Sequence, residues 1–147
     1  MFKKSLLLGI SSGILAGIAG IILLNIYKEA FFTDFSIATA MVGSVKIKIT
    51  ATSIMLITLF MGVLASVIQT LFIKWFKAKG DAIFSLLFAF LSFALMIVPI
   101  SATFDPNDKN VDDMIMLMFP GFGMTLLFFP ALVWFSLKPL FFGTKTN

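Results

Sequence analysis

The chain has 147 residues, of which 60% are hydrophobic and only 12% are charged. A soluble domain of this length has about a quarter of its residues charged, so this composition excludes a soluble globule and indicates one integral membrane domain over residues 1–147. Cys, His and Arg are absent and all eleven cations are Lys. Disulfides, thiolate or imidazole metal sites, His-based catalysis and bidentate Arg recognition are therefore excluded.

Four apolar stretches are long enough to cross a bilayer, whose hydrocarbon core of about 30 Å requires about 20 helical residues. We expect transmembrane helices over residues 5–27, 51–73, 82–100 and 117–138. Outer loops then cover residues 28–50 and 101–113, and an inner loop covers residues 74–81. The sequence thus predicts an all-α, integral-membrane four-helix bundle.

Lysines are distributed unequally between the two sides of this bundle. The side with both termini carries seven Lys against one acid, Asp81, whereas the other side carries four Lys against six acids. Because the Lys excess marks the cytoplasmic side, both termini are predicted to lie in the cytoplasm. The predicted location of the protein is a bacterial inner (cytoplasmic) membrane. The lysines are spread along the chain, which argues against nucleic acid and leaves the lipid bilayer as the expected partner.

Aromatic residues at the span ends agree with this threading. Tyr27, Trp75 and Trp134 fall near the ends of three predicted helices, where interfacial anchors are typical.

The N-terminus has an alternative interpretation. The residues "MFKK" and the apolar run after them could form a cleavable signal peptide. The run continues through Leu24, which is longer than a usual signal core, so an uncleaved helix is the preferred interpretation.

The first span contains the stretch "GISSGILAGIAG" at residues 9–20, in which Gly9, Gly13 and Gly17 recur every four residues. A phosphate-binding loop needs a preceding strand and a different spacing, so nucleotide binding is excluded. Four-residue spacing places the glycines on one helix face of the glycine-zipper kind, where backbones can approach closely. The partner of this face could lie in the same chain, in a homo-oligomer or in a larger membrane complex.

The second span carries a matching face of small and hydroxyl-bearing residues, namely Thr58, Gly62, Ser66 and Thr70. We expect the first two spans to pack along these faces. Ser11, Ser12 and Gln69 are the intramembrane polar residues near the cytoplasmic side. A Gln in lipid needs a partner, so a hydrogen bond between the two spans is predicted.

The long outer loop, residues 28–50, has mixed signals. "VKIKIT" at residues 45–50 alternates like a half-buried strand, but a single strand has no obvious partner. These residues could instead form an extended segment before the second span, or the first turns of that span. "DFSIATAM" could begin a short interfacial helix capped by Asp34 or Ser36.

The third span has small residues on one face, which we expect to point inward: Ala82, Ser85, Ala89 and Ser92. Its bulky residues Phe84, Phe88 and Leu91 should then face lipid or the fourth span.

Three prolines shape the predicted fourth span. Pro120 suits a helix start and Pro139 a helix end, while acids of the preceding loop suit its N-terminal cap. Pro130 lies in the middle and frees the carbonyl of Leu126, which predicts a kink. Thr125 or a neighbouring helix could satisfy the freed group.

Together with the glycine stretch, "FFPALVWFSLKPLFF" at residues 128–142 resembles small bacterial four-span membrane proteins that are uncharacterised. This resemblance implies the four-span fold and contributes no activity.

The spans contain no ionisable residue except Lys138 at one end, which argues against a proton-coupled pump. We expect no catalytic, cofactor-binding or metal-binding residue, and hence no enzyme. The preferred hypothesis is a structural or accessory protein that assembles by small-residue helix packing. The alternative is a passive channel or carrier for a small neutral or lipid-like solute.

Overall fold

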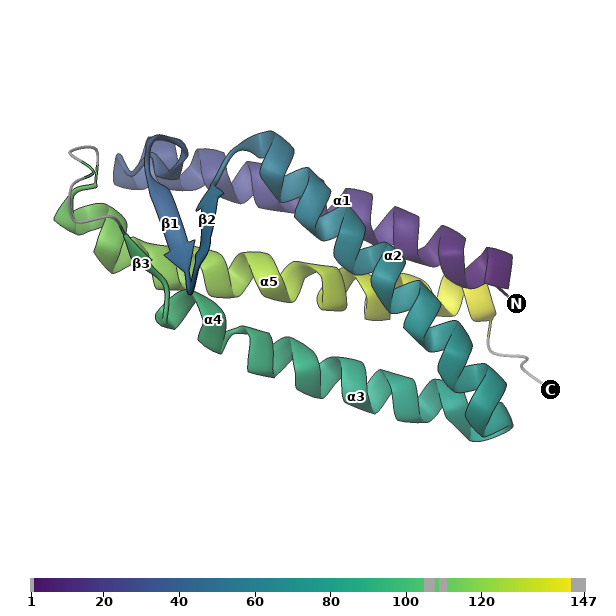
Figure 1. Cartoon of the computed structure of the whole chain (residues 1–147). Coiled ribbons are helices and arrows are strands. Elements are labelled where there is room, and N and C mark those ends of the chain that lie inside the picture. Colours follow the sequence, from purple (N-terminus) through teal and green to yellow (C-terminus); the bar gives the residue numbers. More distant parts are fainter. Residues whose placement is uncertain (1, 105–107, 109–110, 144–147) are drawn as a thin grey trace.

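A computed structural model describes residues 2–104, 108 and 111–143 (Figure 1). The long helices are α1 (Phe2–Phe31), α2 (Ala51–Phe76), α3 (Gly80–Leu95) and α5 (Asp113–Phe142), and α3 is prolonged by the short α4 (Ile97–Ile100). Four helical segments, with α3 and α4 counted as one, are long and apolar enough to cross a membrane. The all-α membrane fold is thus confirmed, and the chain is a multi-pass membrane protein.

The last helix is longer at both ends than the predicted span. The carboxylate of Asp112 accepts a hydrogen bond of 2.8 Å from the amide of Ile115 and caps α5, so a loop acid is the cap, as expected. The prediction that Pro120 starts the helix is wrong, because a capped turn precedes it. The prediction that Pro139 ends the helix is also wrong, since α5 continues to Gly143, whose φ is 41°.

Pro130 is buried inside α5, which is continuous through this position. Thr125 does not relieve the freed carbonyl of Leu126, because its hydroxyl donates to the carbonyl of Gly121 at 2.9 Å. The kink at Pro130 stays a prediction.

The long loop forms most of a small antiparallel sheet. It contains a 3-10 helix, η1 (Phe35–Ile37), followed by β1 (Thr39–Val42) and β2 (Val45–Lys48). A third strand, β3 (Thr103–Phe104), completes the order β2-β1-β3. "VKIKIT" is therefore a strand that has a partner. The hairpin turns at Gly43, whose φ of +61° suits the first position of a two-residue type II′ turn.

Figure 1 shows that α1 begins and α5 ends at one end of the bundle, here called the terminal end, and that the strands lie at the other, here called the sheet end. α1 lies between α2 and α5 and packs against both. α2 and α3 meet at the turn Lys77–Lys79 and separate toward the sheet end.

Each end has its own apolar core. At the sheet end it centres on Phe35, Phe119 and Phe122. At the terminal end Trp134 is fully buried between α3 and α5 against Phe84 and Phe88. Trp134 is therefore core rather than an interfacial anchor.

The inward face of α3 differs from the expected one. It carries Phe84, Phe88 and Ser92, which are buried, while Ala82 is exposed. The two Phe rings face the fourth span, one of the two expected positions, and they form the inward face together with Ser92, the one buried residue of the expected small face. Large rings fill the distance between α3 and α5, which small side chains could not bridge.

The glycines of α1 face α2. A Cβ on Gly13 would lie 2.8 Å from the Leu59 Cα and 2.9 Å from the Thr58 carbonyl oxygen. Gly9 lies against the backbone of Gly62, where a Cβ would collide with the carbonyl. The two backbones are thus close to contact, and the partner of this face is in the same chain.

We predict that Gly13→Leu lowers the free energy of unfolding by about 1–3 kcal/mol or more, because the side chain must displace the backbone of α2. Gly121→Ala is the matched control, since its Cβ would meet only the Tyr27 hydroxyl at an ordinary 3.5 Å. Thermal unfolding in a mild detergent measures both variants. Equal melting of Gly13→Leu and the parent would contradict the observed packing.

Candidate functional site

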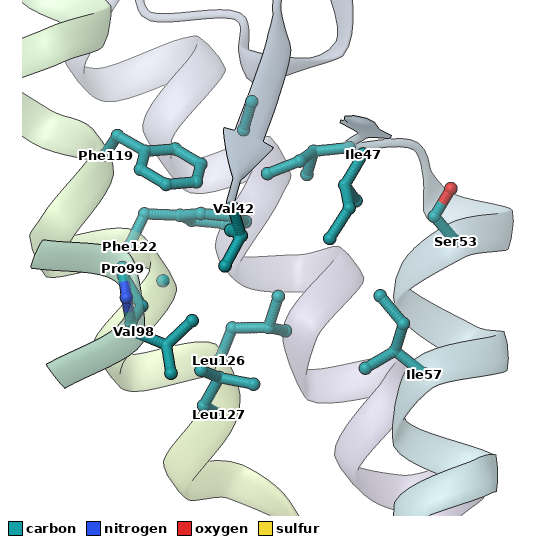
Figure 2. A pocket seen from close by; sticks show the side chains of 13 residues that line it. Val42, Ile47, Ser53, Ile57, Val98, Pro99, Phe119, Phe122, Leu126 and Leu127 are labelled. Atoms are coloured by element: carbon teal, nitrogen blue, oxygen red, sulfur yellow. The ribbon is translucent and has the colours of Figure 1, made fainter. Parts of the chain in front are cut away.

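A cavity of about 280 Å³ lies at the sheet end between α2, α4 and α5, and we call it the sheet cavity (Figure 2). On one side stand Ser53 and Ile57 of α2, and on the other Val98 of α4 and Leu127 of α5. Ser53 is the one polar side chain in the lining, and its hydroxyl is already 2.9 Å from that of Thr50. Because every other lining side chain is apolar, the cavity offers mainly van der Waals contact.

The sheet forms the roof of this cavity through one of its two faces. Successive side chains of a strand point to opposite faces. The cavity-facing residues are Ala40 and Val42 of β1, Ile47 of β2 and the following Ile49. Lys46 and Lys48 alternate with them and are exposed. The sheet is thus amphipathic: its face toward the cavity is apolar, and its opposite face carries the two lysines.

The hairpin is anchored to the bundle by η1, which precedes β1. Asp34 accepts hydrogen bonds from the Ser36 amide at 3.0 Å and from the Ser36 hydroxyl, and it pairs with the Lys28 ammonium at 2.7 Å. The hydrogen bond from Lys28, followed by those from Ser36, lowers the pKa of the Asp34 carboxyl. Phe35, placed by this capped turn, stacks on Phe122 with 4.6 Å between ring centroids. Of the two caps that the sequence offered, Asp34 and Ser36, the structure has Asp34, and the helix is a 3-10 helix of three residues.

The back of the cavity depends on a close approach between α4 and α5. A Cβ on Gly123 would lie 2.6 Å from the Cβ of Pro99. Because Gly123 has no side chain, α4 rests directly on α5 and Pro99 lines the cavity.

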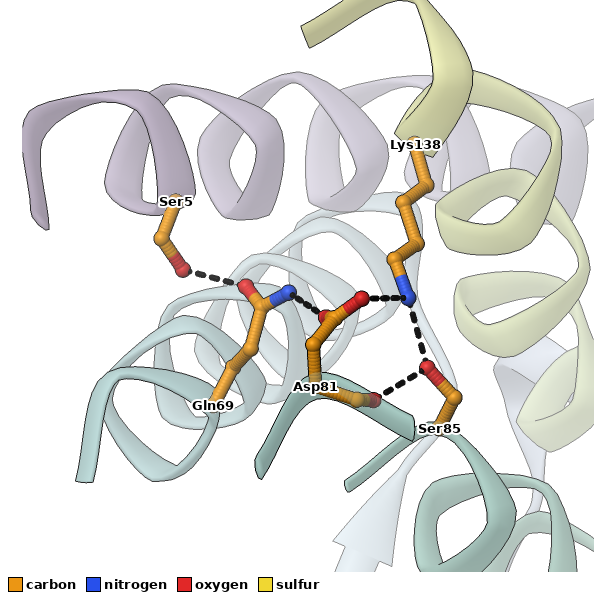
Figure 3. Close-up of polar contacts among 5 residues, drawn as sticks. All are labelled: Ser5, Gln69, Asp81, Ser85 and Lys138. Atoms are coloured by element: carbon orange, nitrogen blue, oxygen red, sulfur yellow. Dashed lines mark hydrogen bonds and ion pairs between the residues drawn. The ribbon is translucent and has the colours of Figure 1, made fainter. Parts of the chain in front are cut away.

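A second feature, the polar network, lies at the terminal end and consists of Ser5, Gln69, Asp81, Ser85 and Lys138 (Figure 3). The Ser5 hydroxyl donates to Gln69 Oε1 at 2.5 Å, and Gln69 Nε2 donates to Asp81 Oδ1 at 2.8 Å. The Lys138 ammonium lies 2.8 Å from Asp81 Oδ2 and donates to Ser85 Oγ at 2.6 Å. All four long helices contribute to this network.

The network contains a hydrogen bond between Gln69 and the first span, as predicted, but neither Ser11 nor Ser12 takes part in it. Gln69 is fully buried and its partner on α1 is Ser5. Ser12 donates instead to the Gly9 carbonyl of its own helix, and Ser11 is half-buried without a role in the network. Ser5 was overlooked because it is the first residue of the predicted span.

The charged pair Asp81–Lys138 was also missed. Both residues had been assigned to the same side of the membrane with opposite charge, and that was the available signal. Their separation of 57 positions gave no local pattern that would pair them.

The hydroxyl face of α2 is satisfied within its own helix. Thr58 donates to the Ile54 carbonyl at 3.0 Å, Ser66 to the Val63 carbonyl at 2.6 Å and Thr70 to the Ser66 carbonyl at 2.8 Å. Thr58, Gly62 and Ser66 are buried and Thr70 is half-buried. These hydroxyls therefore contribute small size to the interface rather than bonds to α1.

No family model matches the chain, and no curated protein or solved structure is significantly similar to it. In the part of the chain that the structure describes, no three Asp, Glu, His or Cys side chains lie together in a way that could hold a metal ion.

We predict a non-additive double-mutant cycle for Asp81→Asn and Lys138→Gln. Each single variant leaves one charge without its partner near the membrane, so each should lower the free energy of unfolding by about 1 kcal/mol or somewhat more. The double variant should lose less than the sum of the two. Denaturation at low ionic strength measures the coupling, and strict additivity would show that the pair is not an interaction of consequence.

Proposed function

We propose that the chain is a non-enzymatic accessory protein of the bacterial cytoplasmic membrane that binds a lipid-like apolar ligand in the sheet cavity. The observation that supports this proposal is the cavity itself, which is apolar, partly open and situated within a helix bundle apolar enough for a bilayer.

The size and lining of the cavity favour a hydrocarbon chain. An apolar cavity of roughly 150 Å³ stays dry and holds benzene, whereas this one measures about 280 Å³. Water would find no polar side chain in the lining other than Ser53, whereas a buried water typically makes about three hydrogen bonds. A segment of one acyl or isoprenoid chain fits this volume, while the remainder of a lipid would lie outside the cavity.

Two other functions have less support. A hydrophilic conduit would need free polar groups, but the hydroxyls of Thr58, Ser66 and Thr70 are bonded within α2. Assembly through the glycine face would need that face to be free, but α2 already covers Gly9, Gly13 and Gly17. A homo-oligomer or larger complex would have to use another surface.

The orientation with both termini in the cytoplasm is part of the proposal. Five exposed lysines gather at the terminal end: Lys3, Lys4, Lys74, Lys77 and Lys79. Asp81, the acid at this end, is paired with Lys138. Asp105, Lys109 and Lys145, which also entered the charge comparison, lie outside the described residues. A lysine excess of this kind favours the cytoplasmic side.

The absence of Cys from the sequence makes orientation easy to test. We predict that Val45→Cys, at the sheet end, reacts with a membrane-impermeant maleimide in intact spheroplasts, whereas Phe2→Cys reacts only after permeabilisation. Both parent residues are exposed, at 60% and 50%. The reverse labelling pattern would overturn the orientation.

Ligand binding is tested by filling the cavity. Ile57→Trp places a larger ring in the cavity, so we predict that lipid retained after release from phosphatidylglycerol nanodiscs falls about tenfold or more, equivalent to about 1.4 kcal/mol. Leu56→Trp is the matched control, because Leu56 is the adjacent residue and is 61% exposed. Native mass spectrometry counts the bound lipid. Equal retention by both variants, or no lipid on the parent, would refute the proposal.

A further inference from the structure

Two lysines on β2 have no function in the fold described so far. We infer that the ligand of the sheet cavity is a lipid with an anionic phosphate headgroup, whose phosphate is bound by Lys46 and Lys48. This inference rests on the proposed function, because the cavity must first hold the apolar part of the lipid.

The position of the two lysines follows from the hairpin. β2 is an edge strand, paired on one side with β1. Ile47, between the two lysines, points down into the cavity lining, so Lys46 and Lys48 point to the opposite, exposed face. Residues two apart on a strand are about 7 Å from each other, so two flexible ammonium groups can reach one phosphate from either side.

The charges around this strand favour an external anion. Among the described residues the ion pairs are Lys28–Asp34 and Asp81–Lys138, and neither Lys46 nor Lys48 takes part in one. Asp34, the acid nearest in sequence to the hairpin of β1 and β2, is already occupied by Lys28 and Ser36. Asp105, which follows β3 in the sequence, lies outside the described residues. The two ammonium groups of β2 are thus available at the surface above the cavity.

Lysines on an edge strand also protect it from pairing with another chain. Protection needs a charge of either sign, whereas phosphate binding needs a positive one. Lys46→Glu/Lys48→Glu therefore separates the two roles, since it preserves a charged edge and reverses its sign.

The experiment uses the full chain in nanodiscs of equal parts phosphatidylglycerol and phosphatidylcholine, with native mass spectrometry of the retained lipid. The parent should retain phosphatidylglycerol about 25-fold over phosphatidylcholine, since each of the two Lys near a membrane surface contributes about a fivefold preference. Lys46→Gln/Lys48→Gln and Lys46→Glu/Lys48→Glu should lose this preference, and Lys46→Arg/Lys48→Arg should keep it. Lys74→Gln/Lys79→Gln, at the terminal end, is the charge-matched control and should leave the ratio unchanged.

The outcomes distinguish this inference from the proposed function. The parent could retain lipid, and Ile57→Trp could lose it, without any preference between the two headgroups. That result would overturn the inference and leave the proposed function intact. The same holds if the phosphatidylglycerol preference survives in the Glu variant. Displacement of the lipid by soluble glycerol phosphate would also overturn it, since the lysines would then bind a free phosphate. No retained lipid on the parent would refute the proposed function itself.

Discussion

The close contact between α1 and α2 is the interaction on which the rest of the structure depends. Lipid offers no hydrophobic driving force between helices, so association relies on close packing and on a few hydrogen bonds. Gly9 and Gly13 meet the backbone of α2 around Gly62, which makes these two helices one unit. α5 then packs on the other side of α1, and α3 is left to join from outside through α2 and α5. The glycine face is covered by this internal packing, so it is not free to contact another molecule.

The two ends of the bundle differ because α3 lies close to α2 at one end only. At the terminal end the turn after α2 places Gly80 directly against the Phe72 carbonyl, and the Asp81–Lys138 pair ties α3 to α5. At the sheet end α4 rests on α5 through Pro99 and Gly123, away from α2. The sheet cavity is the space that results from this divergence, and the hairpin covers it. The polar network at the terminal end and the apolar cavity at the sheet end therefore both follow from the path of α3.

Features that repeat within one segment could be predicted from the sequence, and features that join distant segments could not. Hydropathy located the spans, and four-residue spacing identified the face of α1 that α2 covers. The strand at residues 45–50 was visible, but its partner was overlooked, although Gly43-Ser44 between apolar residues is a hairpin signal. Trp134 was predicted to be an interfacial anchor from its position near a span end, and Phe84 was predicted from the periodicity of small residues to lie opposite the inward face. Neither position nor periodicity shows how far apart two helices lie, and that distance decides which side chains fill the space between them. The Asp81–Lys138 pair could not be predicted from the sequence, because only the fold brings the start of α3 close to the end of α5.

The backbone of the hairpin limits the depth at which the cavity can lie. An edge strand has unpaired N–H and C=O groups, which the hydrocarbon region does not tolerate when they face lipid. β2 is such an edge, so the sheet must lie at the interface, where water and headgroups can satisfy these groups. The apolar face of the sheet then looks into the bilayer and its basic face looks out. The cavity is consequently placed directly below the headgroup layer, at the depth where the acyl chains of a lipid begin.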